Sequence, residues 1–150
     1  MKILCTADIH IGRRASRVPD SFEDIGRFTA ANAWHDIVRC AIDEKVDLLL
    51  IAGDLVDEEN RYFESYGPLE SGLERLASHG IEAIVVAGNH DVEVLPRLVN
   101  SLDGAAADSF HMLGQGGQWE RHTIRREGRP VLHIDGWSFP QRHVRQNPLD

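Results

Sequence analysis

Hydrophobic residues form two kinds of segment in the first hundred positions. Short, nearly continuous apolar runs at 2–7, 46–52 and 81–87 are typical of strands buried on both faces of a sheet. Between them, 21–44 and 62–79 repeat apolar positions at steps of three and four, which predicts helices. Strand and helix therefore alternate, and this order predicts a parallel sheet with helical crossovers.

Single residues refine these helices. Pro68 falls inside the second one, so we expect it near the first turns or at a kink. Gly80 follows the last periodic position and is a natural C-cap. A further short helix is expected over residues 93–101.

The pattern changes after Leu102. Residues 104–117 are rich in Gly and Ala, and we expect loops there around a short strand at 110–113. Two β-like runs, 119–125 and 130–134, flank a turn and predict a hairpin. An α/β (α+β) first part is therefore followed by an antiparallel portion.

Length and hydropathy narrow the class of protein to which the chain can belong. At 150 residues the chain has the length of one domain, 1–150. No apolar run approaches the roughly 20 residues of a membrane helix, and Asp8 and His10 come too early for a signal peptide. Cys5 and Cys40 lie in apolar segments, so we expect small buried side chains rather than a disulfide. The default expectation is a cytoplasmic protein without a membrane contact.

The charge is unevenly distributed. The net charge is −8, and residues 21–100 carry sixteen acidic against six basic side chains. Proteins that grip nucleic acid mainly by charge show a basic excess, which is absent here. An acidic chain can still reach phosphates through metal ions, because carboxylates are the ligands that such ions need.

Each of the three apolar runs ends in polar residues of the same type. The segments are Thr6–His10, Ala52–Asp57 and Ala87–Asp91. Because parallel strands joined by crossover helices end at one edge of a sheet, these side chains are expected to converge. The convergent set is Asp8, His10, Asp54, Asn89, His90 and Asp91.

Carboxylate, imidazole and amide groups suit Mn²⁺, Fe²⁺ or Zn²⁺, since no thiolate is offered. A carboxylate has two oxygens, so Asp54 can bridge two ions that activate water and clamp a phosphate. Asp, Asn and Gly also favour ordinary turns at strand ends. Turn chemistry does not call for His10 and His90, which favours the metal site.

With these three segments the chain resembles the calcineurin-like metallophosphoesterase superfamily, over about residues 1–140. It is most similar to the DNA repair exonuclease branch of SbcD-like and YhaO-like proteins. The resemblance implies a β-sandwich core of two sheets flanked by helices (αββα). It also implies two divalent ions, most often Mn²⁺, with Fe²⁺, Zn²⁺ or Mg²⁺ as alternatives.

The resemblance also implies residue roles. Asp8 and His10 would hold one metal ion, Asp54 would bridge, and Asn89 would hold the second ion. His90 would contact the phosphate and help the leaving oxygen depart. Asp91 would orient His90.

Two departures from the family pattern matter. Protein Ser/Thr phosphatases follow their Gly-Asp with Asp-Arg-Gly, whereas Asp57 here precedes two glutamates, which disfavours that branch. The later family ligands, a further histidine and a Gly-His-x-His, are missing. We therefore expect a second sheet that is cut short and a second ion that binds poorly. The remaining candidates are His111, His122, His133 and His143, with His133 favoured by its apolar strand context.

Arginines near the first two segments are candidates for substrate contacts. Arg13 and Arg14 follow the first segment and are suited to steering a phosphate backbone, although a solvated basic loop is an equal alternative. Arg61 and the two aromatic residues after it are candidates for lining the cleft. A hydrophobic staple for the next helix explains that segment equally well.

The leading hypothesis is a metal-dependent phosphoesterase that uses metal-activated water on phosphodiesters, most simply a DNA repair nuclease. A phosphatase or nucleotide phosphodiesterase of the same superfamily is the alternative within the enzyme class. The third hypothesis is a catalytically inactive module that binds DNA or a partner such as an SMC-like ATPase, because the later histidines are missing. A shortened core would expose apolar surface, which predicts self-association.

Overall fold

A computed structural model describes residues 1–13, 29–57, 62–145 and 147–149 of the chain. Four parallel strands form one sheet in the chain order β1-β2-β3-β4, and two antiparallel strands form a second sheet. The strands are β1 (Ile3–Thr6), β2 (Leu48–Ala52), β3 (Glu82–Val86), β4 (Phe110–Met112), β5 (Glu120–Arg126) and β6 (Arg129–Gly136). The α-helices are α1 (Ala30–Asp43), α2 (Tyr62–Ser78), α3 (Leu95–Ser101) and α4 (Gly104–Ser109), and a 3₁₀ turn, η3, spans Gln115–Gly117.

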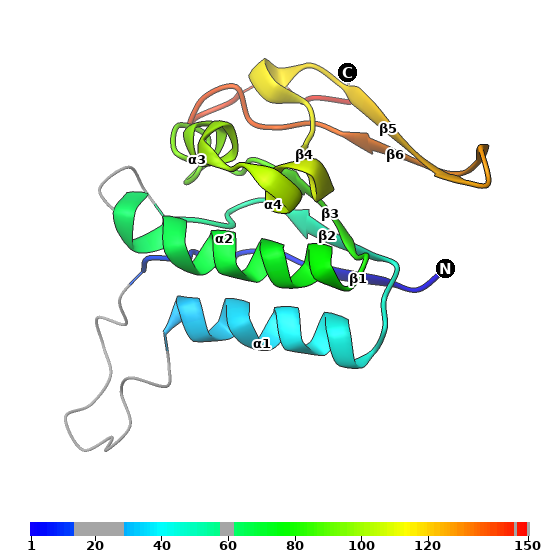
Figure 1. The fold of residues 1–150 in the computed structure, drawn as a ribbon. Coiled ribbons are helices and arrows are strands. Elements are labelled where there is room, and N and C mark those ends of the chain that lie inside the picture. Colours follow the sequence, from blue (N-terminus) through cyan, green and yellow to red (C-terminus); the bar gives the residue numbers. More distant parts are fainter. Residues whose placement is uncertain (14–28, 58–61, 146, 150) are drawn as a thin grey trace.

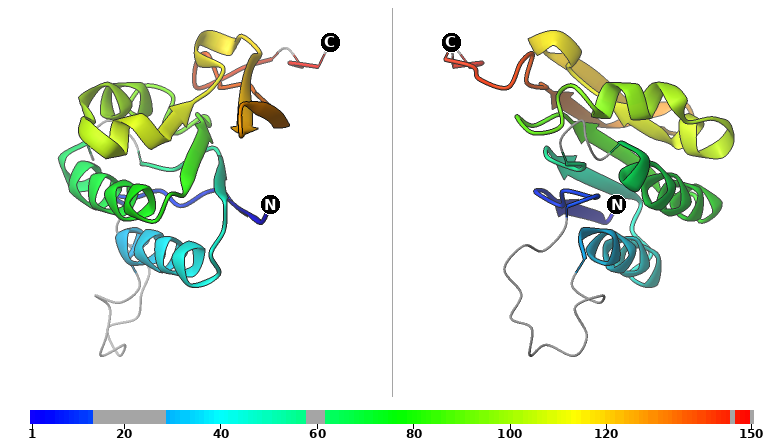
Figure 2. Two further views of the ribbon diagram at one scale, coloured as in Figure 1. Left: turned by 45° about the vertical axis from the view of Figure 1, so that its right-hand side comes forward. Right: turned by 90° about the vertical axis from the view of Figure 1, so that its left-hand side faces the viewer.

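The molecule has three layers (Figures 1 and 2). The four helices lie on one face of the parallel sheet, and the β5–β6 hairpin lies across the other face. Among the described residues this is the αββα order without an outer helical layer on the hairpin. The predicted α/β fold with a parallel sheet flanked by helices is confirmed.

Strand alternation divides the core in two. Leu49, Ile51 and Val85 point toward the helices, where they join the larger apolar cluster. Leu48 and Ile84 point the other way and pack with Leu113 against the hairpin. Ile124, Leu132 and Ile134 are the hairpin side chains in this smaller cluster.

The two long helices are positioned by one tryptophan. Trp34 of α1 is buried, and its indole N–H donates to the Pro68 carbonyl of α2 at 2.9 Å. Gly72 makes room for the ring, because a Cβ there would lie 2.2 Å from the indole nitrogen. Pro68 is thus accommodated inside α2, at the contact between the two helices.

Several boundaries differ from expectation. α1 begins at Ala30, where the Thr29 side chain caps it by accepting from the Asn32 N–H at 3.1 Å. The predicted stretch 21–28 lies outside the described residues. Gly80 does end α2, with a φ of +69°.

Two expectations after Leu102 were wrong. Residues 104–109 form α4 rather than a loop, and their three consecutive alanines are strong helix formers. The short strand at 110–112 pairs in parallel with β3, so it extends the first sheet instead of opening the antiparallel part. The hairpin itself is confirmed, and its turn places Glu127 and Gly128 at positive φ.

The expected burial of both cysteines was also wrong: Cys5 and Cys40 are exposed. Cys40 lies on the solvent side of α1. Cys5 lies on β1 with its side chain on the hairpin side of the sheet, but the hairpin packs over β2, β3 and β4. Ile3 of β1 is 38% exposed for the same reason.

Among the described residues, no helix combines the length and apolar character needed to cross a membrane.

Candidate metal centre

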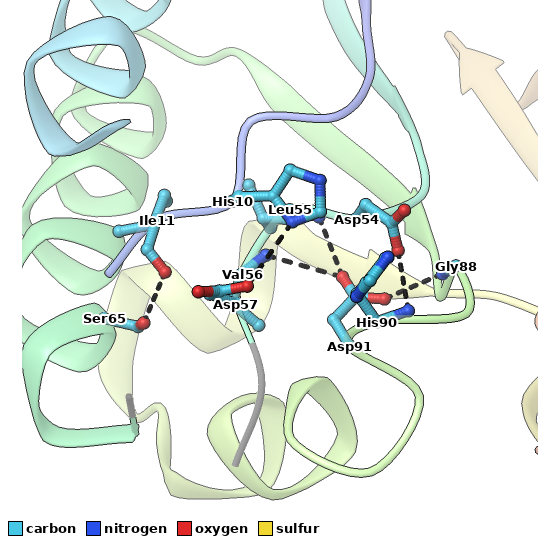
Figure 3. Close-up of polar contacts among 10 residues, drawn as sticks. All are labelled: His10, Ile11, Asp54, Leu55, Val56, Asp57, Ser65, Gly88, His90 and Asp91. Atoms are coloured by element: carbon cyan, nitrogen blue, oxygen red, sulfur yellow. Dashed lines mark hydrogen bonds and ion pairs between the residues drawn. The ribbon is translucent and has the colours of Figure 1, made fainter. Parts of the chain in front are cut away.

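The loops that follow β1 and β2 run side by side at the carboxyl edge of the sheet (Figure 3). The Asp8 N–H donates to the Gly53 carbonyl at 3.1 Å, and the His10 N–H donates to the Asp54 carbonyl at 2.9 Å. Backbone pairing continues one step further, from Ile11 to the Leu55 carbonyl at 2.9 Å. These bonds bring Asp8 and His10 beside Asp54 by main chain alone.

The loop that follows β3 is fastened to the second loop by two carboxylates. Asp54 accepts from the His90 N–H at 3.0 Å. In return, Asp91 accepts from the Leu55 N–H at 2.8 Å and from the Gly88 N–H at 2.7 Å. Each loop therefore supplies a side chain to the backbone of the other, and the three segments are held as one unit.

Asp91 is fully buried, and this raises the pKa of its carboxyl to about 6. The hydrogen bonds from Gly88 and Leu55 act in the opposite direction, while the nearby charge of Asp54 adds to the rise. Its carboxylate accepts from backbone N–H groups and so holds the Leu55 and Gly88 segments together. A role for Asp91 in orienting His90 stays a prediction.

Asp8, His10 and Asp54 each offer a ligand atom, and these atoms lie within 4.8 Å of one another. All three residues have positive φ, of 55°, 52° and 53°. Non-glycine residues adopt this conformation at a cost, so the surrounding hydrogen bonds hold the side chains in an unusual direction. Asp54 is 8% exposed, which makes its carboxylate the buried centre of the group.

A carboxylate lies behind the imidazole ring of His10. Its Nδ1 is buried and lacks a hydrogen-bond partner among the described residues, with the nearest carboxylate, Asp57, at 3.7 Å. A carboxylate behind one ring nitrogen is how metal-ligating histidines are oriented. The His10 and His90 rings meet edge to face, 5.2 Å apart, so both imidazoles line the same place.

The residues present fit a divalent cation. Two carboxylates and an imidazole are donors that such ions accept, and the set contains no thiolate. Gly88 leaves the space that the Asp54 carboxylate occupies, since a Cβ at position 88 would lie 2.2 Å from Asp54 Oδ1. The site is therefore shaped around that carboxylate.

The other predicted site residues lie as follows. Asn89 is partly buried in the loop after β3, between Gly88 and His90. Arg13 is exposed at the end of the first loop. Arg14 and Arg61 fall outside the described residues.

None of the four later histidines joins this group among the described residues. His111 and His122 lie with Glu82 at the other end of β3. His133, the favoured candidate, is on the outward face of the hairpin with its Nδ1 2.9 Å from Thr123 Oγ1. The carboxyl edge thus collects Asp8, His10, Asp54, Asn89, His90 and Asp91.

Two supporting residues were missed from the sequence. Asp57 belongs to the second polar segment, but the sequence assigned it no role. Its place three residues after Asp54 was the only indication that it could support the site. Ser65 of α2 is buried and donates to the Ile11 carbonyl at 2.6 Å, which anchors the first loop. Nothing in the local sequence distinguished Ser65 from a surface serine.

Comparison with known proteins identifies the family to which the sequence is similar. The family model for calcineurin-like phosphoesterases covers residues 1–149. An uncharacterized metallophosphoesterase of Bacillus subtilis, YhaO, is 31% identical over 150 residues, covering 94% of this chain and 34% of the relative. The DNA double-strand break repair protein Mre11 of Methanosarcina mazei is 24% identical over 146 residues, covering 94% of this chain and 23% of that protein.

A second Mre11, from Aeropyrum pernix, is 29% identical over 110 residues, which are 73% of this chain and 26% of that protein. The chain spans about a quarter to a third of the length of these relatives.

Proposed function

The chain belongs to the calcineurin-like phosphoesterase family, and from this premise we propose that it hydrolyses phosphodiester bonds of DNA as a metal-dependent nuclease. Membership of the family implies a hydrolase that depends on metal. DNA as the substrate is the finer step, and the names of the Mre11 relatives support it. The observation that carries the proposal is the buried Asp54 between Asp8, His10 and the His90 loop.

We assign the metal ligands residue by residue. Asp8, His10 and Asp54 hold the first ion, and Asp54 with Asn89 holds a second, weaker one. Mn²⁺ is the proposed ion because carboxylate and amide oxygens outnumber the single imidazole. When bound, such an ion supplies Lewis acidity, which makes water a nucleophile at neutral pH and offsets the charge of the phosphate.

His90 is the proposed proton donor. Its backbone is tied to the Asp54 carboxylate, and its ring lies against the His10 ring, so it stands beside the ligands on a short tether. A histidine there can hold a proton on a ring nitrogen and release it to the leaving oxygen. Arg13, exposed at the rim, would pair with the phosphate backbone.

Asp91 and Asp57 act through others. Asp91 holds the loop backbones at Leu55 and Gly88, which sets the distance between the Asp54 and His90 segments. Asp57 stands 3.7 Å from His10 Nδ1, where it would keep the opposite ring nitrogen toward the ion. Both are positioning residues.

The names of the Mre11 relatives support DNA as a partner, and the resemblance to SbcD-like proteins implies a protein partner. DNA is the substrate, and an SMC-like ATPase is the proposed protein partner. Exposed apolar side chains on β1 support self-association as a further proposal, since the hairpin leaves Ile3 uncovered.

The direct test is hydrolysis in Mn²⁺ of linear duplex DNA and of bis-p-nitrophenyl phosphate. We expect Asp54→Asn to reduce the rate to background, and His90→Asn to reduce it by about 100-fold or more, the usual contribution of a proton donor. His133→Asn, on the outward face of the hairpin, is the matched control and should keep the rate. Faster hydrolysis of mono-p-nitrophenyl phosphate than of the diester would instead indicate a phosphatase.

A catalytically inactive module that binds DNA or a partner is the second candidate. It is favoured by one observation: among the described residues the second ion has only Asp54 and Asn89, because His111, His122 and His133 lie elsewhere. Folded protein that binds Mn²⁺ and DNA but hydrolyses neither diester would establish this candidate and refute the nuclease.

A further inference from the structure

A second group of metal-ligating side chains lies at the opposite edge of the parallel sheet. Glu82, His111 and His122 each offer a ligand atom, all within 4.8 Å of one another. The Nε2 atoms of both histidines lie 3.0 Å from the same glutamate oxygen, Oε1. The two imidazole rings stack, with centroids 4.4 Å apart and an interplanar angle of 27°.

The three side chains come from two layers. Glu82 opens β3, and His111 lies on the neighbouring strand β4, so both are held by the register of the parallel sheet. His122 comes from β5 of the hairpin, where it pairs with Ile134. Directly beside them, Ile84 and Leu48 pack against hairpin side chains, so an apolar contact continues into this polar group.

We propose that Glu82, His111 and His122 form a zinc site that fastens the β5–β6 hairpin to the parallel sheet. Two imidazoles and one carboxylate are a three-ligand set that Zn²⁺ accepts, with water as the fourth ligand. The donor balance is the reverse of that at the carboxyl edge, where two carboxylates meet one imidazole. Nitrogen-rich donors favour Zn²⁺ over Mn²⁺, so the two edges should differ in metal preference.

The existing geometry needs little change to accept the ion. Both Nε2 atoms already face one oxygen. Zinc binding requires each ring to carry its proton on Nδ1, so that Nε2 offers its lone pair to the ion. Tetrahedral coordination with bonds of about 2.1 Å places donor atoms ~3.4 Å apart. The two Nε2–Oε1 contacts in the structure are 3.0 Å, so each would lengthen slightly. The side chains are 34%, 31% and 23% exposed in the order Glu82, His111, His122, so an ion can enter from solvent.

This site is independent of the proposed nuclease. Glu82 begins β3 and the Asn89 loop follows its end, which separates the two groups by roughly 20 Å of extended strand. Either site can therefore be removed without touching the other, and the failure of one proposal leaves the other standing.

The test uses Zn²⁺ alone on chelator-stripped protein that carries Asp8→Asn and Asp54→Asn, so that the carboxyl edge no longer competes. Calorimetric titration is expected to show one zinc ion per chain. His122→Ala or His111→Ala should weaken binding by at least about 100-fold, since even residues behind metal ligands contribute 10- to 100-fold. The matched control is His133→Ala, also on the hairpin, which should bind zinc like the parent.

Two further measurements cover a variant that fails to fold. Glu82→Gln keeps the size of the side chain and one oxygen, and it should weaken zinc binding in protein with an unchanged circular dichroism spectrum. Co²⁺ in place of zinc should give tetrahedral ligand-field absorption in the parent and not in Glu82→Gln. Absence of zinc binding in the parent, or equal affinity in His122→Ala and His133→Ala, overturns the proposal.

Discussion

The two edges of the parallel sheet carry side chains that can bind metal, but they are built differently. At the carboxyl edge the proposed metal ligands stand in loops after the strands, and buried carboxylates that accept from backbone N–H groups join those loops. At the amino edge Glu82, His111 and His122 stand within strands and meet across two layers. The first group is held by hydrogen bonds between loops, and the second connects the two sheets.

The two edges also differ in how deeply their polar side chains are buried. Asp54 and Asp91 at the carboxyl edge are buried, whereas Glu82, His111 and His122 at the amino edge are a quarter to a third exposed. Burying a carboxylate costs free energy, and at Asp91 hydrogen bonds from backbone N–H groups offset part of that cost. Buried carboxylates that are hydrogen-bonded to backbone are typical of a site that must hold its geometry during catalysis.

The largest effect is expected from removing the carboxylate that joins the loops. Asp91→Ala leaves the buried N–H groups of Leu55 and Gly88 without acceptors, at about 1–3 kcal/mol each, so unfolding free energy should fall by ~2–6 kcal/mol. Urea denaturation measures this. Glu93→Ala, an exposed acid two residues away, is the control and should change stability little. Equal stability of the two variants would show that the loops are not held by Asp91.

The next effect is expected on catalysis. In Gly88→Ala the new methyl group would lie 2.2 Å from Asp54 Oδ1 and 2.9 Å from the Asp54 backbone nitrogen, so the carboxylate must move. A displacement of about 1 Å at a reacting centre costs roughly 100-fold in rate. We expect that loss in kcat/KM on the diester substrate. Gly67→Ala of α2, where a Cβ meets no atom within 4 Å, should retain full activity.

A smaller effect on stability is expected where the β5–β6 hairpin packs on the parallel sheet. Ile124→Ala removes partly buried apolar contacts with Leu48 and Ile84, which should lower unfolding free energy by about 1–2 kcal/mol, less than for a fully buried isoleucine. Val131→Ala is the control on the same hairpin, because Val131 is 49% exposed. A diester hydrolysis rate that stays near the parent's would confirm that the two regions are energetically separate.

The smallest effect concerns the surface of the hairpin. Side-chain hydrogen bonds from Arg121, at 2.6 and 2.8 Å, hold the pKa of Asp135 below its ordinary 3.8. Because the folded pKa is lowered, any stabilisation is present above pH 3.8 and is lost as the pH falls through the folded pKa. Arg121→Ala should raise the pKa of Asp135 toward 3.8 in an NMR titration. Arg125→Ala should not, and stability at neutral pH should be unchanged because the pair is exposed.

The first half of the fold was predictable because its determinants are local. Apolar runs, helical periodicity and Gly80 placed β1, β2, β3 and α2 to within a few residues. The same convergence at the carboxyl ends predicted the meeting of Asp8, His10 and Asp54. Family resemblance supplied the roles proposed for them.

The errors have non-local causes. Cys5 lies in an apolar run and yet is exposed, because the hairpin packs over the other three strands and leaves the outer face of β1 uncovered. The Gly-Ala-rich segment at 104–109 folds as α4, which packs against the α2 side of the sheet. Likewise, no spacing rule relates Glu82 to His111 and His122, which lie 29 and 40 residues further along.

The sequence by itself determined the order of strands and helices, the edge at which the polar segments collect, and the residue types offered there. Periodicity and strand polarity depend only on neighbouring residues, so they can be read from the chain. Tertiary structure alone decided which carboxylates accept hydrogen bonds from backbone N–H groups, which side chains the hairpin covers, and that two histidines share Glu82. Those outcomes depend on distances between segments remote in sequence, and only the packing of sheet, helices and hairpin sets them.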